Sequence, residues 1–314
     1  MFTLNLQILA PAQRRLWDEL GHTPSEFVLY GGTALALRLG HRHSEDFDFF
    51  SNRSFAPDVL RKSIPYLEDA EMSQFETNPL TAIVDRDGPV KVSFFGDLKL
   101  NRVYEPEVAQ DNRIHVASLL DVAATKLSTI QQRAQARDYE DLAAIVGSGI
   151  SLAEALGAAV AVYGREFNGA LSLKALTYFV DGDLPNLGPA AQKRLRTLAS
   201  EVDLREIPQV QAKIGLTGED KMSQPDLQRV AKRVIWFEAP DDALKDVKLF
   251  LAHVMTNGTL SDINTVLQDF SEDDFEATLN DPPPGVFDRR SWIYWNVRYH
   301  REPVPPLPQR KLPA

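Results

Sequence analysis

The sequence predicts an α+β protein in which a strand-rich N-terminal part is followed by helices. Short apolar runs of strand length, ended by glycine, proline or polar residues, occur between about residues 12 and 105. From about 115 to 200 the apolar residues recur at spacings of three and four, which is typical of amphipathic helices. A further helical pattern follows a stretch poor in apolar residues, so we expect a separate all-α domain at the C-terminal end.

These patterns divide the chain into five segments. We expect a core at 1–112, a helical subdomain at 113–202, a linker at 203–225, a C-terminal helical domain at 226–303 and a Pro-rich tail at 304–314. Within the core, the runs 80–84 and 90–95 are separated by polar turn residues and predict a hairpin.

The first motif is a glycine turn between a buried strand and a short helix. Residues 27–30 form an apolar, strand-like run, and Gly31 and Gly32 end it before a leucine-rich helix that stops at Gly40. Glycine permits positive φ and the close approach of a ligand, and Thr33 is placed to cap the helix. Because the first N–H groups of a helix point at such a turn, we expect Gly31, Gly32 and Thr33 to hold a triphosphate.

A strand with two carboxylates follows this helix. Residues 46–50 predict a strand on which Asp46 and Asp48 share one face, roughly 7 Å apart at Cα, with Ser44 on the same side. Two carboxylates this close repel each other, and a divalent cation would remove the repulsion. We therefore expect Asp46 and Asp48 to be metal ligands for Mg²⁺ or Mn²⁺, and Ser44 to contact phosphate or metal-bound water.

Each motif alone has a structural interpretation. A D-x-D pattern on a strand is usually a solvated or edge face, and Gly-Gly-Thr is usually only a turn. Their occurrence in this order, with one helix between them, favours nucleotide binding.

A second motif lies on a long predicted helix over residues 117–145. Lys126 lies off the apolar stripe of this helix, where its ammonium can bind a triphosphate if the helix borders the cleft. Asp138 and Asp141 are one turn apart. Taken alone, the segment equally fits a solvated face with ion pairs at i,i+4 spacing. Beside the first motif, we expect Lys126 and Asp138 to be site residues, with Asp141 in a structural role.

These residues resemble the AbiEii/AbiGii toxin family of nucleotidyltransferases, within the DNA polymerase β-like superfamily. The first matching piece is Gly31-Gly32-Thr33-Ala34-Leu35 with His41-Arg42-x-Ser44-x-Asp46-x-Asp48-Phe49, and the second runs from Lys126 to Leu142. The resemblance covers roughly the first two thirds of the chain. It implies a mixed-sheet nucleotidyltransferase core with appended helices, and a lysine and an acidic residue of the later motif that are required for activity. It also implies transfer of a nucleotide from an NTP to an acceptor, in relatives often the 3′ end of tRNA, by a growth-arresting toxin.

The chain departs from the superfamily pattern at one position. The superfamily usually supplies a third carboxylate from a neighbouring strand, and Ser93 stands in the run 90–95 where an aspartate is expected. That acid often helps to deprotonate the attacking hydroxyl, so a serine in its place is expected to reduce the efficiency of the reaction. By itself, the serine does not remove metal binding by Asp46 and Asp48.

The C-terminal helices resemble the small helical antitoxins that are encoded beside such toxins. This resemblance rests on Trp236-Phe237, on the run 250–258 and on Arg290-Ser291-Trp292-x-Tyr294-Trp295. The alternative is a helical extension that completes the fold, and the sequence does not choose between them.

The composition and net charge of the chain limit the partners that it can bind. The 314 residues are 44% apolar and contain no cysteine, which excludes disulfides and thiolate metal sites. The N-terminus lacks a basic, apolar leader and no run is long enough to cross a membrane, so we expect a cytoplasmic protein with no membrane partner. The net charge of −10 repels nucleic acid on average, so an RNA acceptor needs a local basic patch. Candidates are Arg133 with Arg137, and Lys193-Arg194-x-Arg196.

Three functions remain open from the sequence. The first is a metal-dependent nucleotidyltransferase that acts on RNA such as tRNA and is restrained in cis by its C-terminal helices or by a separate antitoxin. The second is a weak or inactive nucleotidyltransferase fold that senses nucleotides or binds a protein, which Ser93 and the acidic surface favour. The third is a non-toxic enzyme that modifies a small molecule or a protein hydroxyl.

Overall fold

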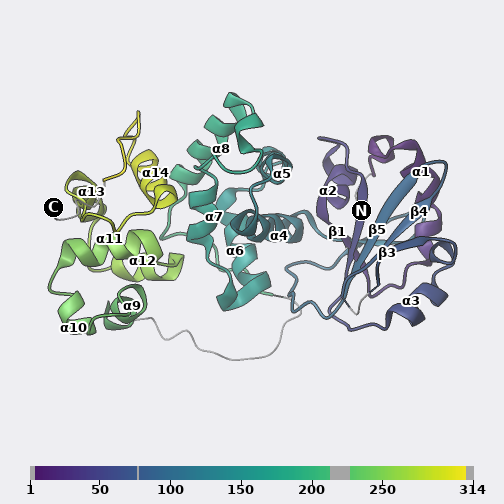
Figure 1. Ribbon diagram of the computed structural model, residues 1–314, viewed down its shortest axis with the longest axis horizontal. Coiled ribbons are helices and arrows are strands. Elements are labelled where there is room, and N and C mark those ends of the chain that lie inside the picture. Colours follow the sequence, from purple (N-terminus) through teal and green to yellow (C-terminus); the bar gives the residue numbers. More distant parts are fainter. Residues whose placement is uncertain (1–3, 76–77, 213–226, 309–314) are drawn as a thin grey trace. The chain divides into compact units, whose positions relative to one another are not determined.

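The computed structural model describes residues 4–75, 78–212 and 227–308, and these residues form two compact units. Of the described residues, the first unit takes 4–75, 78–126, 144–164 and 209–212, and the second takes 127–143, 165–208 and 227–308. The strands occupy the purple-to-blue part of the chain, and the helices from α4 onward run from teal to yellow (Figure 1).

The first unit contains the sheet. Its elements are α1 (Pro11–Trp17), β1 (Val28–Tyr30), α2 (Gly31–Leu39), β2 (Asp46–Phe50), α3 (Pro57–Ser63), β3 (Glu71–Phe75), β4 (Leu80–Asp85), β5 (Pro89–Phe95), β6 (Glu107–Val108), β7 (His115–Val116) and α6 (Leu152–Tyr163). Two helices belong to both units along the chain, α4 (Leu119–Gln132) and α5 (Ala136–Gly147). Single 3₁₀ turns cover Leu6–Ile8, Glu19–His22, Pro65–Leu67, Gly164–Glu166 and Leu184–Asn186.

The strands are arranged in the order β3-β4-β5-β2-β1-β7-β6. β2 pairs in parallel with β5 and antiparallel with β1, while β1 pairs in parallel with β7. The expected mixed sheet is therefore confirmed, and so is the β4–β5 hairpin. β3, β6 and β7 were not expected, because β3 is mostly exposed and lacks an apolar face, and β6 and β7 have two residues each.

One face of the sheet forms the core of this unit. Phe47 and Phe49 of β2 are fully buried, and Phe49 stacks on Phe94 of β5 with ring centroids 5.4 Å apart. Trp17 of α1 packs against Phe47 on this face. Since strand side chains alternate, the intervening residues of β2 lie on the opposite face.

The predicted helix over 117–145 is wrong as one element, because the structure breaks it between α4 and α5. Arg133 lies in the break and Arg137 lies on α5, so they are not neighbours on one helix. The break is stabilised at α5, where the Ala136 N–H donates to Asp183 Oδ1 at 2.7 Å. A Cβ at Gly182 would lie 2.1 Å from the Ala134 carbonyl oxygen, so the backbone packs closely there.

The second unit is helical. Its remaining elements are α7 (Gly169–Ala175), α8 (Pro189–Glu201), α9 (Leu227–Val234), α10 (Pro240–Ala243), α11 (Val247–Asn257), α12 (Leu260–Val266), α13 (Glu272–Asn280) and α14 (Arg289–Arg298). Trp295 of α14 is fully buried, packs on Phe275 and donates its indole N–H to the Met255 carbonyl at 2.8 Å. A capping box formed by Ser271 and Asp274 begins α13.

Parts of four predicted segments lie outside the described residues. These are 1–3 and 76–77 of the core, 213–225 of the linker, residue 226 of the C-terminal domain and 309–314 of the tail. The described part of the tail contacts α14, since Trp292 Nε1 donates to the Pro305 carbonyl at 2.8 Å. Among the described residues, no single helix is long and apolar enough to span a membrane. The helices α5 and α6 meet this length and composition only when they are counted together.

Candidate functional site

The two carboxylates lie where the sequence places them. β2 alternates between half-buried and buried residues, so Asp46 and Asp48 share the face opposite Phe47 and Phe49. Asp48 pairs with Tyr30, the last residue of β1. The carboxylate pair is therefore next to the point where β1 passes into α2.

Gly31 brings this turn against Asp48. Its φ is +72°, a conformation that glycine adopts without steric cost. A Cβ added at Gly31 would lie 2.9 Å from Asp48 Oδ2, closer than ordinary van der Waals contact. The absence of a side chain thus allows a carboxylate oxygen to lie against the first residue of α2.

Gly32 makes a second close approach. A Cβ at Gly32 would lie 2.6 Å from a terminal nitrogen of Arg42 and 2.8 Å from Ser44 Oγ. Ser44 therefore lies against the N-terminal turn of α2, while its contact with phosphate stays a prediction. The Arg42 guanidinium is a cation at the positive end of a helix dipole, and this arrangement favours an anion between them.

Thr33 does not cap α2, contrary to expectation. The helix begins at Gly31 with Tyr30 in the cap position, so Thr33 is its third residue and is buried. Its hydroxyl donates to the Asp46 carbonyl oxygen, which ties α2 to the start of β2. The hydroxyl positions the carboxylate strand, and only the Thr33 backbone N–H belongs to the helix N-terminus.

β5 supplies the neighbours of both carboxylates. In the parallel pairing of β2 with β5, Ser93 lies opposite Asp48 and Lys91 lies opposite Asp46. Ser93 is 2% exposed, and its Oγ is 3.4 Å from the Thr81 hydroxyl. Lys91 Nζ forms an ion pair with Asp46 Oδ2 at 3.1 Å. A serine and a lysine thus occupy the strand positions beside the two acids.

Lys126 lies on α4 in the first unit and is 6% exposed. Five residues earlier, Asp121 accepts from the backbone N–H groups of Val103 and Tyr104 and from the Ser118 hydroxyl. Burial raises the pKa of Asp121, and these donors oppose the rise. Asp121 anchors the start of α4 and the loop before it.

Tyr30 is a buried neighbour of the site. Burial raises the pKa of its phenol, and the charge of Asp121 raises it further. Its ring stacks on Phe50 with centroids 4.9 Å apart. The phenol stays protonated at neutral pH and can serve as a hydrogen-bond donor.

Asp138 belongs to the second unit and is completely buried. Both of its oxygens accept from Arg133, at 2.8 Å from Nε and 3.2 Å from a terminal nitrogen. Asp141 is also fully buried. The bonds to Arg133 give Asp138 a structural role like the one that we predicted for Asp141. The catalytic role of Asp138 stays a prediction.

The carboxylate oxygens of Asp46 and Asp48 are suitable ligands for a divalent cation. Asp46 and Asp48 share one face, and Asp48 lies at a turn that a Cβ would fill. Among the described residues, no group of three or more His, Cys, Asp or Glu side chains gathers as a metal site. A cation here would need oxygen atoms from a substrate to complete its coordination, which is typical of Mg²⁺ with phosphates.

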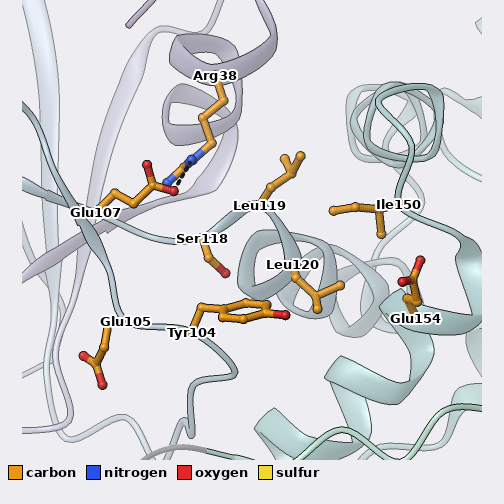
Figure 2. Close-up of a pocket in the computed structure, with 9 residues that line it drawn as sticks. All are labelled: Arg38, Tyr104, Glu105, Glu107, Ser118, Leu119, Leu120, Ile150 and Glu154. Atoms are coloured by element: carbon orange, nitrogen blue, oxygen red, sulfur yellow. Dashed lines mark hydrogen bonds and ion pairs between the residues drawn. The ribbon is translucent and has the colours of Figure 1, made fainter. Parts of the chain in front are cut away.

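A cavity of about 520 Å³ lies elsewhere in the first unit. Figure 2 shows the Arg38–Glu107 ion pair, at 3.2 Å, on one side and Leu120 and Ile150 on the other. Burial lowers the pKa of Arg38, and Glu107 opposes that shift. None of the predicted site residues lines this cavity, so it takes no part in the candidate site.

Sequence reasoning missed two cations. Arg42 entered only as a letter of the family motif, although its spacing of two from Ser44 suggested a shared side of the chain. Lys91 gave no local signal, because its partner Asp46 is 45 residues away and the β2–β5 pairing decides the contact.

The chain is similar to several known proteins. Residues 15–227 match the family described as nucleotidyl transferase AbiEii toxin of type IV toxin–antitoxin systems. An uncharacterized protein of Aquifex aeolicus strain VF5 is 32% identical over 160 residues, which are 50% of this chain and 75% of that protein. Among solved structures, MenT4, a nucleotidyltransferase toxin from Mycobacterium tuberculosis H37Rv, is similar with a TM-score of 0.44 and 19% identity, over 61% of this chain and 82% of its own. Because the family match covers more than half of the chain and includes both motifs, this protein belongs to the AbiEii family of nucleotidyltransferase toxins.

Proposed function

We propose that this protein transfers a nucleotide from an NTP to an acceptor hydroxyl at the site formed by β2 and the start of α2. The observation that carries the proposal is the contact between Asp48 and the Gly31 turn, where a Cβ would lie 2.9 Å from the carboxylate. It joins an anion-binding helix start to a cation-binding pair of carboxylates.

The triphosphate is held by the N-terminal turn of α2. The backbone N–H groups of Gly31, Gly32 and Thr33 supply donors, and the helix dipole favours the negative charge. Ser44 and Arg42, both against Gly32, add a hydroxyl and a guanidinium. Lys126 supplies a further positive charge to the phosphates.

Asp46 and Asp48 hold Mg²⁺ or Mn²⁺ through their oxygens. When bound, such a cation neutralises the charge that develops on the phosphates and on the leaving pyrophosphate. Thr33 fixes the strand for this task, since its hydroxyl bonds the backbone of Asp46.

In the reaction, the acceptor hydroxyl oxygen forms a bond to the α-phosphorus of the NTP. The bond from that phosphorus to the oxygen bridging to the β-phosphate breaks, and pyrophosphate leaves with the electron pair. The hydroxyl proton passes to water or to a carboxylate of the Asp46–Asp48 pair, since Ser93 offers no carboxylate to accept it. The catalytic role that we expected for Asp138, which is to orient Lys126 or a water molecule, stays a prediction.

The acceptor that we favour is RNA, with the 3′ end of tRNA as the first candidate. With a net charge of −10, the protein needs local basic groups to bind it. Lys193, Arg194 and Arg196 of α8 supply such a group, and Arg196 lies over the ring of Phe179 at 5.4 Å.

The C-terminal helices complete the second unit, and this interpretation has more support than a fused antitoxin. Arg298 of α14 donates to the carbonyls of Ser200 and Val202 at 3.2 and 2.9 Å, where α8 ends. Lys174 of α7 donates to the Thr256 carbonyl at 2.6 Å. If these helices also restrain the enzyme in cis, expression of the full chain leaves growth unaffected, whereas an unrestrained toxin slows growth and loses that effect on Asp48→Ala.

The test is transfer of α-³²P-labelled nucleotide to total tRNA by the full chain with Mg²⁺ or Mn²⁺. We expect Asp46→Asn and Asp48→Asn to lower the rate by about 100-fold or more while the circular dichroism spectrum is unchanged. Asp58→Asn, which alters an exposed carboxylate in the first turn of α3, is the matched control and keeps the wild-type rate. Equal transfer by all four proteins refutes the assignment.

A second candidate function is nucleotide binding without turnover, which Ser93 opposite Asp48 favours. Calorimetric binding of an NTP that depends on Asp48, with no transfer to RNA, protein or small-molecule hydroxyls, distinguishes it from the first.

A further inference from the structure

Lys91 is a charged residue of the site that the proposed function does not use. It lies at the register position opposite Asp46 on the parallel strand β5, with its Nζ 3.1 Å from Asp46 Oδ2. Its side chain is 46% exposed and that of Asp46 is 33% exposed, so the pair is open to solvent.

The charge balance of this face explains why a cation lies there. Asp46 and Asp48 alone carry two negative charges on adjacent same-face positions and repel each other. Lys91 offsets one of these charges through its ion pair with Asp46. The same ammonium engages Asp46 Oδ2, an oxygen that a divalent cation would require.

We propose that Lys91 is a built-in counter-ion of the carboxylate pair. It holds Asp46 in place when no divalent cation is bound, and it leaves Asp46 and turns to the triphosphate when the carboxylate takes up a cation. This inference rests on the proposed function, because it requires that Asp46 be a metal ligand.

Two features make the exchange physically accessible. The ion pair is exposed, and pairs of this kind contribute only about 0.2–1 kcal/mol, so a divalent cation can displace the ammonium. The lysine side chain is long and flexible, which lets the ammonium move several ångströms while β5 stays in register. Lys91 is therefore a positioning residue for Asp46 before the substrate binds.

The proposal predicts that loss of the lysine charge tightens metal binding. In Lys91→Met, the competing cation and its repulsion of the metal are absent, so we expect Mn²⁺ to bind about three- to tenfold more tightly than in the wild type. Lys91→Arg keeps the charge and stays near wild type. Lys62→Met, which removes an exposed lysine from the last turn of α3, is the matched control for a general change of net charge.

The measurement is Mn²⁺ titration of the full chain at low salt, with free Mn²⁺ followed by electron paramagnetic resonance and without NTP or acceptor. Tighter binding by Lys91→Met alone, together with a raised KM for NTP at saturating Mn²⁺, supports the proposal. Unchanged or weaker Mn²⁺ binding by Lys91→Met overturns it, while the proposed function survives if Asp46→Asn abolishes binding. Wild-type Mn²⁺ binding that is insensitive to Asp46→Asn overturns the metal assignment itself, and Lys91 with it.

Discussion

Replacement of Gly31 by alanine should impair metal binding and nucleotide transfer much more than the stability of the fold. Gly31 has a φ of +72°, and an alanine in this left-handed region costs about 1–2 kcal/mol. The added methyl group would lie 2.9 Å from Asp48 Oδ2, so the carboxylate has to move by a few tenths of an ångström or more. We expect the melting temperature to fall by roughly 2–8 °C and Mn²⁺ binding and nucleotide transfer to fall much further.

Gly40 offers the matched control on the same helix. It ends α2 with a φ of +59°, and a Cβ there would meet the side-chain amide of Asn5 at 2.6 Å, at the end of the helix opposite to the end that contacts Asp48. Gly40→Ala carries the same backbone cost, so its thermal shift should match that of Gly31→Ala.

The assay is a pair of thermal melts with Mn²⁺ titration and labelled-nucleotide transfer, carried out on both variants below their melting temperatures. The account predicts similar melting temperatures and loss of metal binding and transfer in Gly31→Ala only. Equal retention of both activities by the two variants would show that the contact between Gly31 and Asp48 has no functional role.

Three further predictions follow from single contacts. Ser93→Asp adds a buried carboxylate beside Asp48. Without metal, the melting temperature of this variant should be lower than that of Ser93→Asn, and added Mn²⁺ should raise it more. An equal rise in the melting temperatures of the two variants with Mn²⁺ contradicts this. Arg133→Met leaves the buried carboxylate of Asp138 without its bidentate partner and should destabilise the second unit by about 1–3 kcal/mol, measured by urea unfolding. Burial lowers the pKa of Lys174 to about 8 from 10.5, so between these pH values the unfolded chain binds the proton that the folded chain lacks, and stability rises with pH across this window. Lys174→Met should lose that component of the rise, and a melting profile over pH 7–10 parallel to that of the wild type would argue against it.

Local sequence was sufficient for the first motif. The strand, the glycine turn, the helix and the carboxylate strand follow one another within residues 27–50, so spacing alone predicted β1, α2 and β2 and the shared face of Asp46 and Asp48. The hairpin of β4 and β5 was predicted for the same reason.

Contacts between distant segments could not be predicted in this way. The pairing of Lys91 with Asp46 depends on the parallel register of β2 and β5, which a single sequence does not specify. The helix break at Arg133 has no glycine or proline, and it depends on Asp183 and Gly182 from a later loop. Thr33 was predicted as a cap because threonine favours that position, but its hydroxyl found the Asp46 carbonyl instead.

The most direct test of the central claim is anomalous diffraction at the manganese edge from crystals soaked with Mn²⁺ and a non-hydrolysable NTP analogue. The account predicts a Mn²⁺ peak bound by Asp46 and Asp48, with the triphosphate against the backbone N–H groups of Gly31 and Gly32. A nucleotide bound elsewhere, or a peak without contact to both carboxylates, would contradict it.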